Sequence, residues 1–272
     1  MKRGFVVIAS IALTVASALS GCGGGGARTS GEGEIALRIG ATAVPHAEIL
    51  NAARPLLSEQ GIALEVVEFT DYIQPNVQVY EKQLDANFFQ HQPYLDQFNQ
   101  DHGMDLASVG SVHIEPFGAY SETWDSAEGL PDKAIVAIPN DPTNAGRALA
   151  LLEKNGLLTL KEGAGVNAAV ADIAANPKGL ELKELEAAML PRVMADVDLA
   201  LINTNYALEA GFVPTEDALF LEDGDSPYVN VVAVRSDRIQ DASIMALMEA
   251  LRSDEVRDFI LEQYEGSIIP VD

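Results

Sequence analysis

Cysteine, aromatic residues and recognisable catalytic motifs are scarce in this sequence of 272 residues. The single cysteine cannot form an internal disulfide, and aromatic residues make up only 6% of the chain. No phosphate-binding loop or Gly-x-Ser-x-Gly elbow occurs, and no zinc spacing such as His-Glu-x-x-His is found among His46, His91, His102 and His113. The sequence therefore predicts no disulfide, no metal and no other cofactor, and it favours a binding protein over an enzyme.

Basic residues are also few. The chain has 17 Lys and Arg against 41 Asp and Glu, a formal net charge of −24. Residues 1–21 hold two basic groups and no acidic ones, so without them 15 basic residues face 41 acidic ones and the charge becomes −26. Such a surface repels nucleic acids and anionic lipid headgroups, and we expect neither as a partner. One buried arginine can still make a single pocket locally positive.

The first residues have the pattern of an export signal. Lys2 and Arg3 precede an apolar run over residues 5–19, which is too short for a comfortable membrane span. The tetrapeptide Leu19-Ser20-Gly21-Cys22 resembles a bacterial lipobox, in which the cysteine is acylated and becomes the new N-terminus. We therefore expect residues 1–21 to be a lipoprotein signal peptide. An ordinary secretory peptide with an incidental cysteine is the alternative.

Lipidation of Cys22 would anchor the mature chain to a membrane on its extracytoplasmic side. Residues 22–34 begin with this cysteine and four consecutive glycines, and most of the residues that follow are small or polar. This composition is typical of a flexible tether. The folded part is expected to begin at about residue 35.

The folded part opens as an α/β unit. Residues 35–41 have strand character, residues 47–60 have apolar residues at helical spacing, and residues 63–69 form a second strand pattern. Two strands joined through a helix favour a parallel pair with a right-handed crossover. The hydrophobic content of 48% is enough to bury a core. The sequence thus predicts the α/β fold class.

The order of the later segments predicts two lobes. The composition turns small and polar near residues 118–128, and residues 222–230 have the pattern of a return crossing. We therefore expect one lobe made of residues 35–119 and 224–272, and a second lobe made of residues 120–223. The helices expected inside the second lobe cover residues 143–155, 166–175, 189–195 and 207–210.

Residues 139–147 join a strand pattern to a helical pattern. Asp141 is placed to cap the helix, with Pro142 at the first helical position, where its missing N–H costs nothing. The free N–H groups of a helix start favour an anion. Asn144 and Arg147 lie three apart, so Arg147 could close on a carboxylate through two hydrogen bonds while Asn144 adds a neutral donor. The alternative is a capped surface helix with a solvated arginine.

Residues 85–94 form the most aromatic stretch of the chain. Successive strand residues face opposite sides of a sheet, so at least one of Phe88 and Phe89 is expected in the core. His91 and Tyr94 lie three apart at an expected helix start. A lone histidine is more often a structural hydrogen-bonding residue than a ligand contact, and this is the alternative for His91.

Further polar clusters follow other strand patterns. Tyr72 follows one strand of the first lobe, Asn203 and Asn205 follow one of the second lobe, and the return crossing adds Tyr228 and Asn230. Clusters at strand ends of two lobes indicate a hinged cleft that encloses a small molecule. Plain helix capping is the alternative for the first two asparagines. An arginine suits a carboxylate, asparagines suit an amino-acid head group, and aromatic rings suit an apolar or sulfur-bearing side chain.

Several of these segments resemble the NlpA family of lipoproteins, the methionine-binding components of ABC importers. The resemblance runs from the lipobox to the last helix, and it is carried by residues 69–72, 85–96, 139–147, 185–186, 202–206 and 226–230. It implies a two-lobed periplasmic-binding-protein type II fold with a hinged cleft between the lobes. It also implies L-methionine as the ligand, and an ABC permease with its ATPase as the partners.

Carried over by motif, the resemblance implies roles for eight side chains. Arg147 would bind the ligand carboxylate with support from Asn144, and Asn205 and Asn230 would hold the amino-acid backbone groups. The residues that would shape the side-chain pocket are Tyr72, Phe89, His91 and Tyr94.

Other ligands and functions stay open at this point. Some methionine binders have threonine at the position of Asn205. D-methionine, methionine sulfoxide or a small dipeptide would therefore also satisfy the contacts expected for an amino-acid head group. A surface interaction protein or adhesin, whose acidic face meets a host or cell-wall partner, is the alternative from another class. A lyase or hydrolase on the same fold would have to use His91 with an acid, and no oriented nucleophile is evident.

Overall fold

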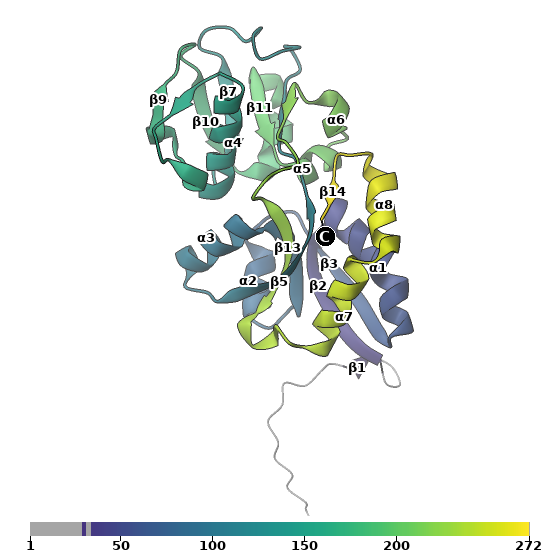
Figure 1. Ribbon diagram of the computed structural model, residues 1–272. Coiled ribbons are helices and arrows are strands. Elements are labelled where there is room, and N and C mark those ends of the chain that lie inside the picture. Colours follow the sequence, from purple (N-terminus) through teal and green to yellow (C-terminus); the bar gives the residue numbers. More distant parts are fainter. Residues whose placement is uncertain (1–28, 31–33, 272) are drawn as a thin grey trace, which may run out of the picture.

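The computed structural model describes residues 29–30 and 34–271, which form two lobes joined at a narrow waist (Figure 1). Each lobe is built on its own β-sheet with helices around it. The expected signal peptide and Cys22 lie outside the described residues. Within the described ranges, no helix combines the length and the apolar character needed to cross a membrane.

The first lobe, in the lower part of Figure 1, contains a seven-stranded sheet. Its strands are β1 (Thr29–Ser30), β2 (Glu34–Thr42), β3 (Ile62–Phe69), β4 (Ala86–His91), β5 (Leu106–Ile114), β13 (Val229–Arg235) and β14 (Ile269–Pro270). They lie in the order β1-β2-β4-β13-β5-β14, and β3 also pairs with β2. The β2–β3 pair is parallel, as expected for the opening unit, whereas β13 is antiparallel to both β4 and β5.

Helices cover this sheet and bury its core. They are α1 (Glu48–Glu59), α2 (Gln74–Tyr80), α3 (Gln92–His102), α7 (Ala242–Leu251) and α8 (Asp254–Tyr264). A π-helical turn, η1 (Ala43–Ala47), precedes α1 and buries His46. Leu50 and Leu57, on one face of α1, share a core cluster with Ile39 of β2. This amphipathic spacing is the reason that α1 forms and packs against α7 and α8.

The second lobe has a five-stranded sheet in the order β10-β7-β11-β6-β12. These strands are β6 (Gly118–Tyr120), β7 (Ile135–Pro139), β10 (Glu181–Leu185), β11 (Leu199–Ile202) and β12 (Phe220–Leu221). β7 pairs in parallel with β10 and β11, and β6 is antiparallel to β11 and β12. The other regular elements include α4 (Pro142–Lys154), α5 (Thr204–Glu209), α6 (Pro214–Asp217) and the small β8–β9 pair (Thr159–Leu160 and Ile173–Ala175).

Two helices expected in the second lobe are not α-helices. Residues 166–175 form short 3₁₀ turns and β9 instead, and Val166 and Val170 are exposed, so an α-helix here would have little apolar surface to bury. The segment expected as a helix over residues 189–195 is part of a 3₁₀ helix, η4 (Ala187–Asp196). Pro191 lies inside it and lacks the N–H that an α-helix would need there.

Strand pairing also bears on where the chain crosses between the lobes. Gly118 and Ala119 belong to β6, which pairs only with strands of the second sheet. We propose that the first crossing lies ahead of Gly118, two residues before the boundary expected from composition. Part of the expected tether is also in the fold, because Thr29 and Ser30 pair with the start of β2. The return crossing runs between β12 and β13.

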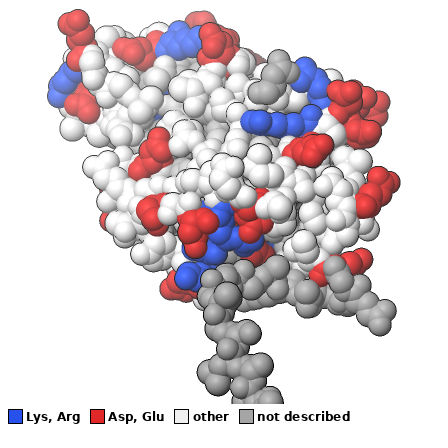
Figure 2. All heavy atoms as spheres, turned by 60° about the horizontal axis from the view of Figure 1, so that its bottom comes forward, with Lys and Arg blue, Asp and Glu red and all other residues white. Residues whose placement is uncertain are grey.

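The surface carries the acidic excess of the sequence. Figure 2 shows acidic side chains spread over the face that it brings forward, with the fewer basic side chains lying close to them. Among the basic residues of the first lobe, Arg38 pairs with Glu65, and Arg238 pairs with Asp85 and Asp241. The positive charges of this lobe are therefore partly neutralised by neighbouring carboxylates.

Gly146 in α4 is expected to tolerate no side chain. A Cβ added there would lie 2.2 Å from the carbonyl oxygen of Val166 and 2.9 Å from the amide nitrogen of Ala168, and both are backbone atoms. Gly146→Ala should therefore lower the free energy of unfolding by about 1–3 kcal/mol, as overpacking does elsewhere. Urea unfolding would measure this.

Gly129→Ala is the matched control. Its added Cβ would first meet a backbone oxygen at 3.4 Å, an ordinary van der Waals contact. We expect this variant to unfold within about 0.5 kcal/mol of the wild type. Equal stability of the two variants would contradict the close backbone approach at Gly146.

Candidate functional site

All eight side chains expected at a ligand site line one cavity between the lobes. The cavity also receives Asn203, which belongs to an expected cleft cluster, and three residues that the sequence did not single out; its complete lining is Tyr72, Phe89, Gln90, His91, Tyr94, Glu115, Asn144, Arg147, Asn203, Thr204, Asn205 and Asn230. Its volume is about 20 Å³, so the lobes must separate or side chains must move before an amino acid can enter.

The start of α4 brings its polar side chains to this cavity. Asp141 caps the helix, accepting a hydrogen bond from the backbone N–H of Asn144 at 2.9 Å. The side-chain oxygen of Asn144 lies 3.1 Å from Nε2 of His91 and accepts a hydrogen bond from Asn203 at 2.9 Å. His91 in turn caps α3, because its Nδ1 accepts from the backbone N–H of Tyr94. Asn144 thus links the two lobes through His91.

His91 is a neutral donor in this network. Its Nδ1 accepts a hydrogen bond, so the proton lies on Nε2, which faces Asn144. Burial, together with the positive charge of Arg147, lowers the pKa of His91 to about 3. A neutral imidazole with both nitrogens engaged serves to fix geometry.

Arg147 is buried, with 3% of its surface exposed, so it is not a solvated surface arginine. Its Nε donates to both carboxylate oxygens of Glu222, at 3.1 and 3.2 Å, and its Nη2 bonds the same carboxylate and the carbonyl oxygen of Glu115. The guanidinium lies over the ring of Tyr228 at 4.3 Å and that of Phe117 at 5.2 Å. Glu222 therefore occupies the Nε edge of the Arg147 guanidinium. The sequence alone left this edge free for a ligand carboxylate.

Aromatic rings form the opposite wall. The ring of Tyr72 lies 5.8 Å from those of Phe89 and Tyr94 and 5.1 Å from that of Tyr206. Phe88 is part of the main core of the first lobe, so the expected alternation of the two phenylalanines is confirmed. Tyr72 donates a hydrogen bond of 2.6 Å to the side-chain oxygen of Asn205, which is a second link between the lobes.

Tyr72 and Tyr94 also line a second, larger hollow of about 390 Å³. Acidic side chains reach this hollow from both lobes, among them Asp71, Asp101 and Glu186. The two tyrosines therefore separate the small buried cavity from a wider, acidic opening. A ligand side chain that extends past them would enter this opening.

The asparagines before and within α5 are not plain helix caps. Asn203 is the N-cap residue of α5, but its side chain makes no capping hydrogen bond. Among the described residues, the side-chain oxygen of Asn203 and the side-chain nitrogen of Asn205 are buried and have no hydrogen-bond partner. Buried polar atoms of this kind are costly unless a ligand or water pairs with them. They therefore indicate hydrogen-bonding positions for a polar ligand.

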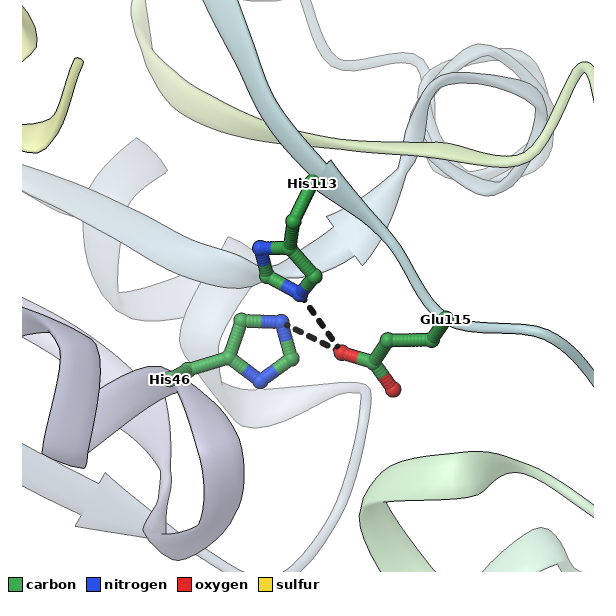
Figure 3. Close-up of side chains that lie close together, drawn as sticks. All are labelled: His46, His113 and Glu115. Carbon is green, nitrogen blue, oxygen red and sulfur yellow. Dashed lines mark hydrogen bonds and ion pairs between the residues drawn. The ribbon is translucent and has the colours of Figure 1, made fainter. Parts of the chain in front are cut away.

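Glu115 is the charged residue of the cavity lining that sequence reasoning missed. It is only 5% exposed, and its carboxylate accepts hydrogen bonds from Nε2 of His113 and from the backbone N–H of Asn205, while Nε2 of His46 lies 3.1 Å from the oxygen that His113 contacts (Figure 3). Burial raises its pKa, while His46 and Arg147 oppose that rise. A signal was present, because an acidic residue directly follows an apolar strand two residues after a histidine.

These three side chains are also of the types that bind metal ions. One nitrogen of each histidine and one oxygen of Glu115 lie within 4.8 Å of one another. In this structure the same atoms are within hydrogen-bond distance of each other, at 2.9 Å for His113 and 3.1 Å for His46. His113 hydrogen-bonds Glu115 in this cluster, and His46 hydrogen-bonds Asn230.

Comparison with known proteins places the chain in one family. Residues 37–272 match the NlpA lipoprotein family. The chain is 40% identical to the methionine-binding lipoprotein MetQ of Bacillus subtilis over 276 residues, covering 100% of this chain and 99% of that protein. It is 39% identical to the D-methionine-binding lipoprotein MetQ of Escherichia coli over 236 residues, covering 86% and 87%.

A solved structure extends the likeness to the fold. The nutrient binding protein of Burkholderia cenocepacia, whose structure was determined bound to methionine, superposes with a TM-score of 0.85 at 45% identity, covering 87% of this chain and 100% of that one. The expectation of a two-lobed periplasmic-binding fold is confirmed by this likeness. The chain belongs to the NlpA lipoprotein family.

Proposed function

We propose that this protein captures L-methionine, or a close analogue, and delivers it to the permease and ATPase of an ABC importer. Three features support the proposal: the family membership, the methionine-binding names of the relatives, and the methionine bound in the Burkholderia structure. Cys22 would carry the lipid anchor that holds the protein outside the cytoplasmic compartment. The protein would perform no chemistry on its ligand.

The observation that carries the proposal is the placement of opposite charges around one cavity. Arg147 and Glu115 both line it, and both are almost completely buried. An α-amino acid at neutral pH carries one carboxylate and one ammonium group. Arg147 would bind the carboxylate, and Glu115 would bind the ammonium. Because Glu222 holds the Nε edge of Arg147, the ligand would approach from its Nη1 side.

The remaining side chains suit the rest of a methionine molecule. Asn205 and Asn230 would complete the head-group hydrogen bonds, with Asn144 supporting Arg147 from the same helix. The thioether chain would lie against Tyr72, Phe89, His91 and Tyr94, because sulfur packs favourably on aromatic rings. His91 is neutral and has both nitrogens engaged with Asn144 and Tyr94, so it would shape the pocket and not transfer protons.

Ligand identification is the direct test. The protein should be unfolded and refolded to remove retained ligand, and then titrated by calorimetry with L-methionine, D-methionine, methionine sulfoxide and glycyl-methionine. We expect the tightest binding for a free methionine. The mass of the small molecule released on denaturing freshly purified protein should agree. No heat and no thermal shift with any of the four would overturn the proposal.

The acidic surface gives the adhesin alternative a distinct outcome in the same experiments. A protein partner recognised by that surface would still bind after Arg147 and Asn205 are replaced. Binding lost with the cavity residues, and methionine uptake lost from cells that carry the variants, would instead support the transport role.

A further inference from the structure

Two buried histidines lie beneath the cavity and converge on one carboxylate oxygen. His46 comes from the η1 turn and His113 from the end of β5, and both point their Nε2 atoms at Oε1 of Glu115 (Figure 3). The distances are 3.1 Å from His46 and 2.9 Å from His113. Neither histidine lines the cavity, so neither would touch a ligand itself.

The hydrogen-bond partners define which ring nitrogen carries the proton. Nε2 of His46 faces two acceptor oxygens, those of Asn230 and Glu115, so a neutral His46 carries its proton on Nε2, and its Nδ1 lies 2.7 Å from the hydroxyl oxygen of Thr42. Nδ1 of His113 has no partner within the described residues, whereas its Nε2 faces an acceptor. Burial lowers the pKa of His46 to about 4 and that of His113 to about 3. At neutral pH each ring is therefore uncharged, and His113 offers its N–H to Glu115 whereas His46 offers its N–H to Asn230.

Glu115 is held from both of its oxygens. Oε1 accepts from His113 at 2.9 Å and lies 3.1 Å from Nε2 of His46, and Oε2 accepts from the backbone N–H of Asn205 at 3.1 Å. Hydrogen bonds to a carboxylate stabilise its charged form against the cost of burial. Because the imidazoles are neutral, they orient the carboxylate without cancelling its negative charge. The charge remains for a cation in the cavity.

Packing keeps the two rings in place. His46 meets Phe88 edge-on with ring centroids 4.7 Å apart, and His113 meets the same ring at 5.3 Å. The two imidazoles are themselves 5.1 Å apart. Nε2 of His46 also lies 3.1 Å from the side-chain oxygen of Asn230, a second cavity residue. His46 therefore sets the orientation of two groups that face the ligand.

We propose that His46 and His113 are positioning residues that make the site selective for ligands with a protonated α-amino group. His113 holds the Glu115 carboxylate at the cavity and His46 holds the Asn230 side chain beside it, and together they would discriminate an amino acid from the same molecule without its amine. This inference rests on the proposed function, because it assumes an amino-acid ligand. It adds to that function two residues that would determine ligand specificity although neither of them lines the cavity.

The test compares two ligands across matched variants of the full chain in detergent. The ligands are L-methionine and 4-(methylthio)butanoate, which has the same carboxylate and thioether but no amine. His113→Leu removes the N–H donor, whereas His113→Gln keeps one at similar reach. We expect His113→Leu to weaken methionine binding by ~10- to 100-fold and butanoate binding by less than about threefold. His113→Gln should retain most of the methionine affinity that His113→Leu loses.

His46→Leu and His46→Gln should show the same pattern. A Leu variant that weakens both ligands equally, or a Gln variant that behaves like Leu, would overturn the inference in favour of a packing role. Unchanged methionine binding in the Leu variants would overturn it as well. If chelation with EDTA changes methionine affinity of the wild type, the cluster is a metal site and the positioning role is wrong. Wild type that binds neither ligand would contradict the proposed function itself, an outcome distinct from a defect confined to the variants.

Discussion

Arg147→Ala is expected to weaken methionine binding by about 2–5 kcal/mol, because it removes a charged hydrogen-bond partner from a desolvated cleft. The guanidinium is 3% exposed and holds Glu222 and the carbonyl oxygen of Glu115 at once. Its loss would leave the ligand carboxylate without a counter-charge and Glu222 without its partner. Calorimetric titration against the wild type measures the effect.

Arg192→Ala is the control for this substitution. Arg192 is an exposed arginine of the same lobe, so the change in net charge is identical. We expect its methionine affinity to equal that of the wild type. Thermal unfolding of both variants without ligand separates lost binding from lost folding. An Arg147→Ala affinity within threefold of the wild type, with the fold intact, would rule out the carboxylate role.

Acidification is expected to destabilise the protein steeply between about pH 6.5 and pH 4. Burial lowers the pKa of His46 to about 4 and the pKa values of His91 and His113 to about 3, against an ordinary value of 6.5. In this window the unfolded chain binds protons that the folded chain excludes, so stability falls as the pH falls. Each histidine contributes about 1.4 kcal/mol per pH unit.

Two buried carboxyl groups act in the opposite direction. Burial raises the pKa of Glu115 and that of Asp141, so the folded state takes up protons there more readily than the unfolded state. Three histidines against two carboxyl groups leave a net loss of stability in acid. Urea unfolding at pH 6.5, 5.5 and 4.5 would measure it. His113→Gln should reduce the pH dependence of the free energy of unfolding by up to one proton. An unchanged pH dependence in this variant would contradict the buried neutral state of His113.

Local chemistry made the strand-to-helix junctions predictable. Asp141 and Pro142 predict the start of α4, and the structure has the cap and the helix there. Likewise, the alternation that places Phe88 in the core and Phe89 at the cavity is a property of a single strand. Because these signals lie within a few residues of each other, the sequence alone indicates which side chains reach the cleft.

The parts that were missed depend on contacts between distant segments. His46 comes from a different segment than His113 and Glu115, and no spacing in the chain relates it to them. Glu222 lies 75 residues from Arg147, so the pair that fills one edge of the guanidinium could not be foreseen. The helix expected over residues 166–175 failed for a related reason, because its valines find no surface to cover.

The place of β13 in the first sheet determines the order in which the chain can fold. β13 lies between β4 and β5, yet it follows the entire second lobe in the sequence. The first sheet therefore stays incomplete until residues 229–235 have been synthesised, whereas the second lobe draws its sheet from residues 118–221 alone. Until then β4 and β5 lack the strand that lies between them, although β2 and β3 can already pair.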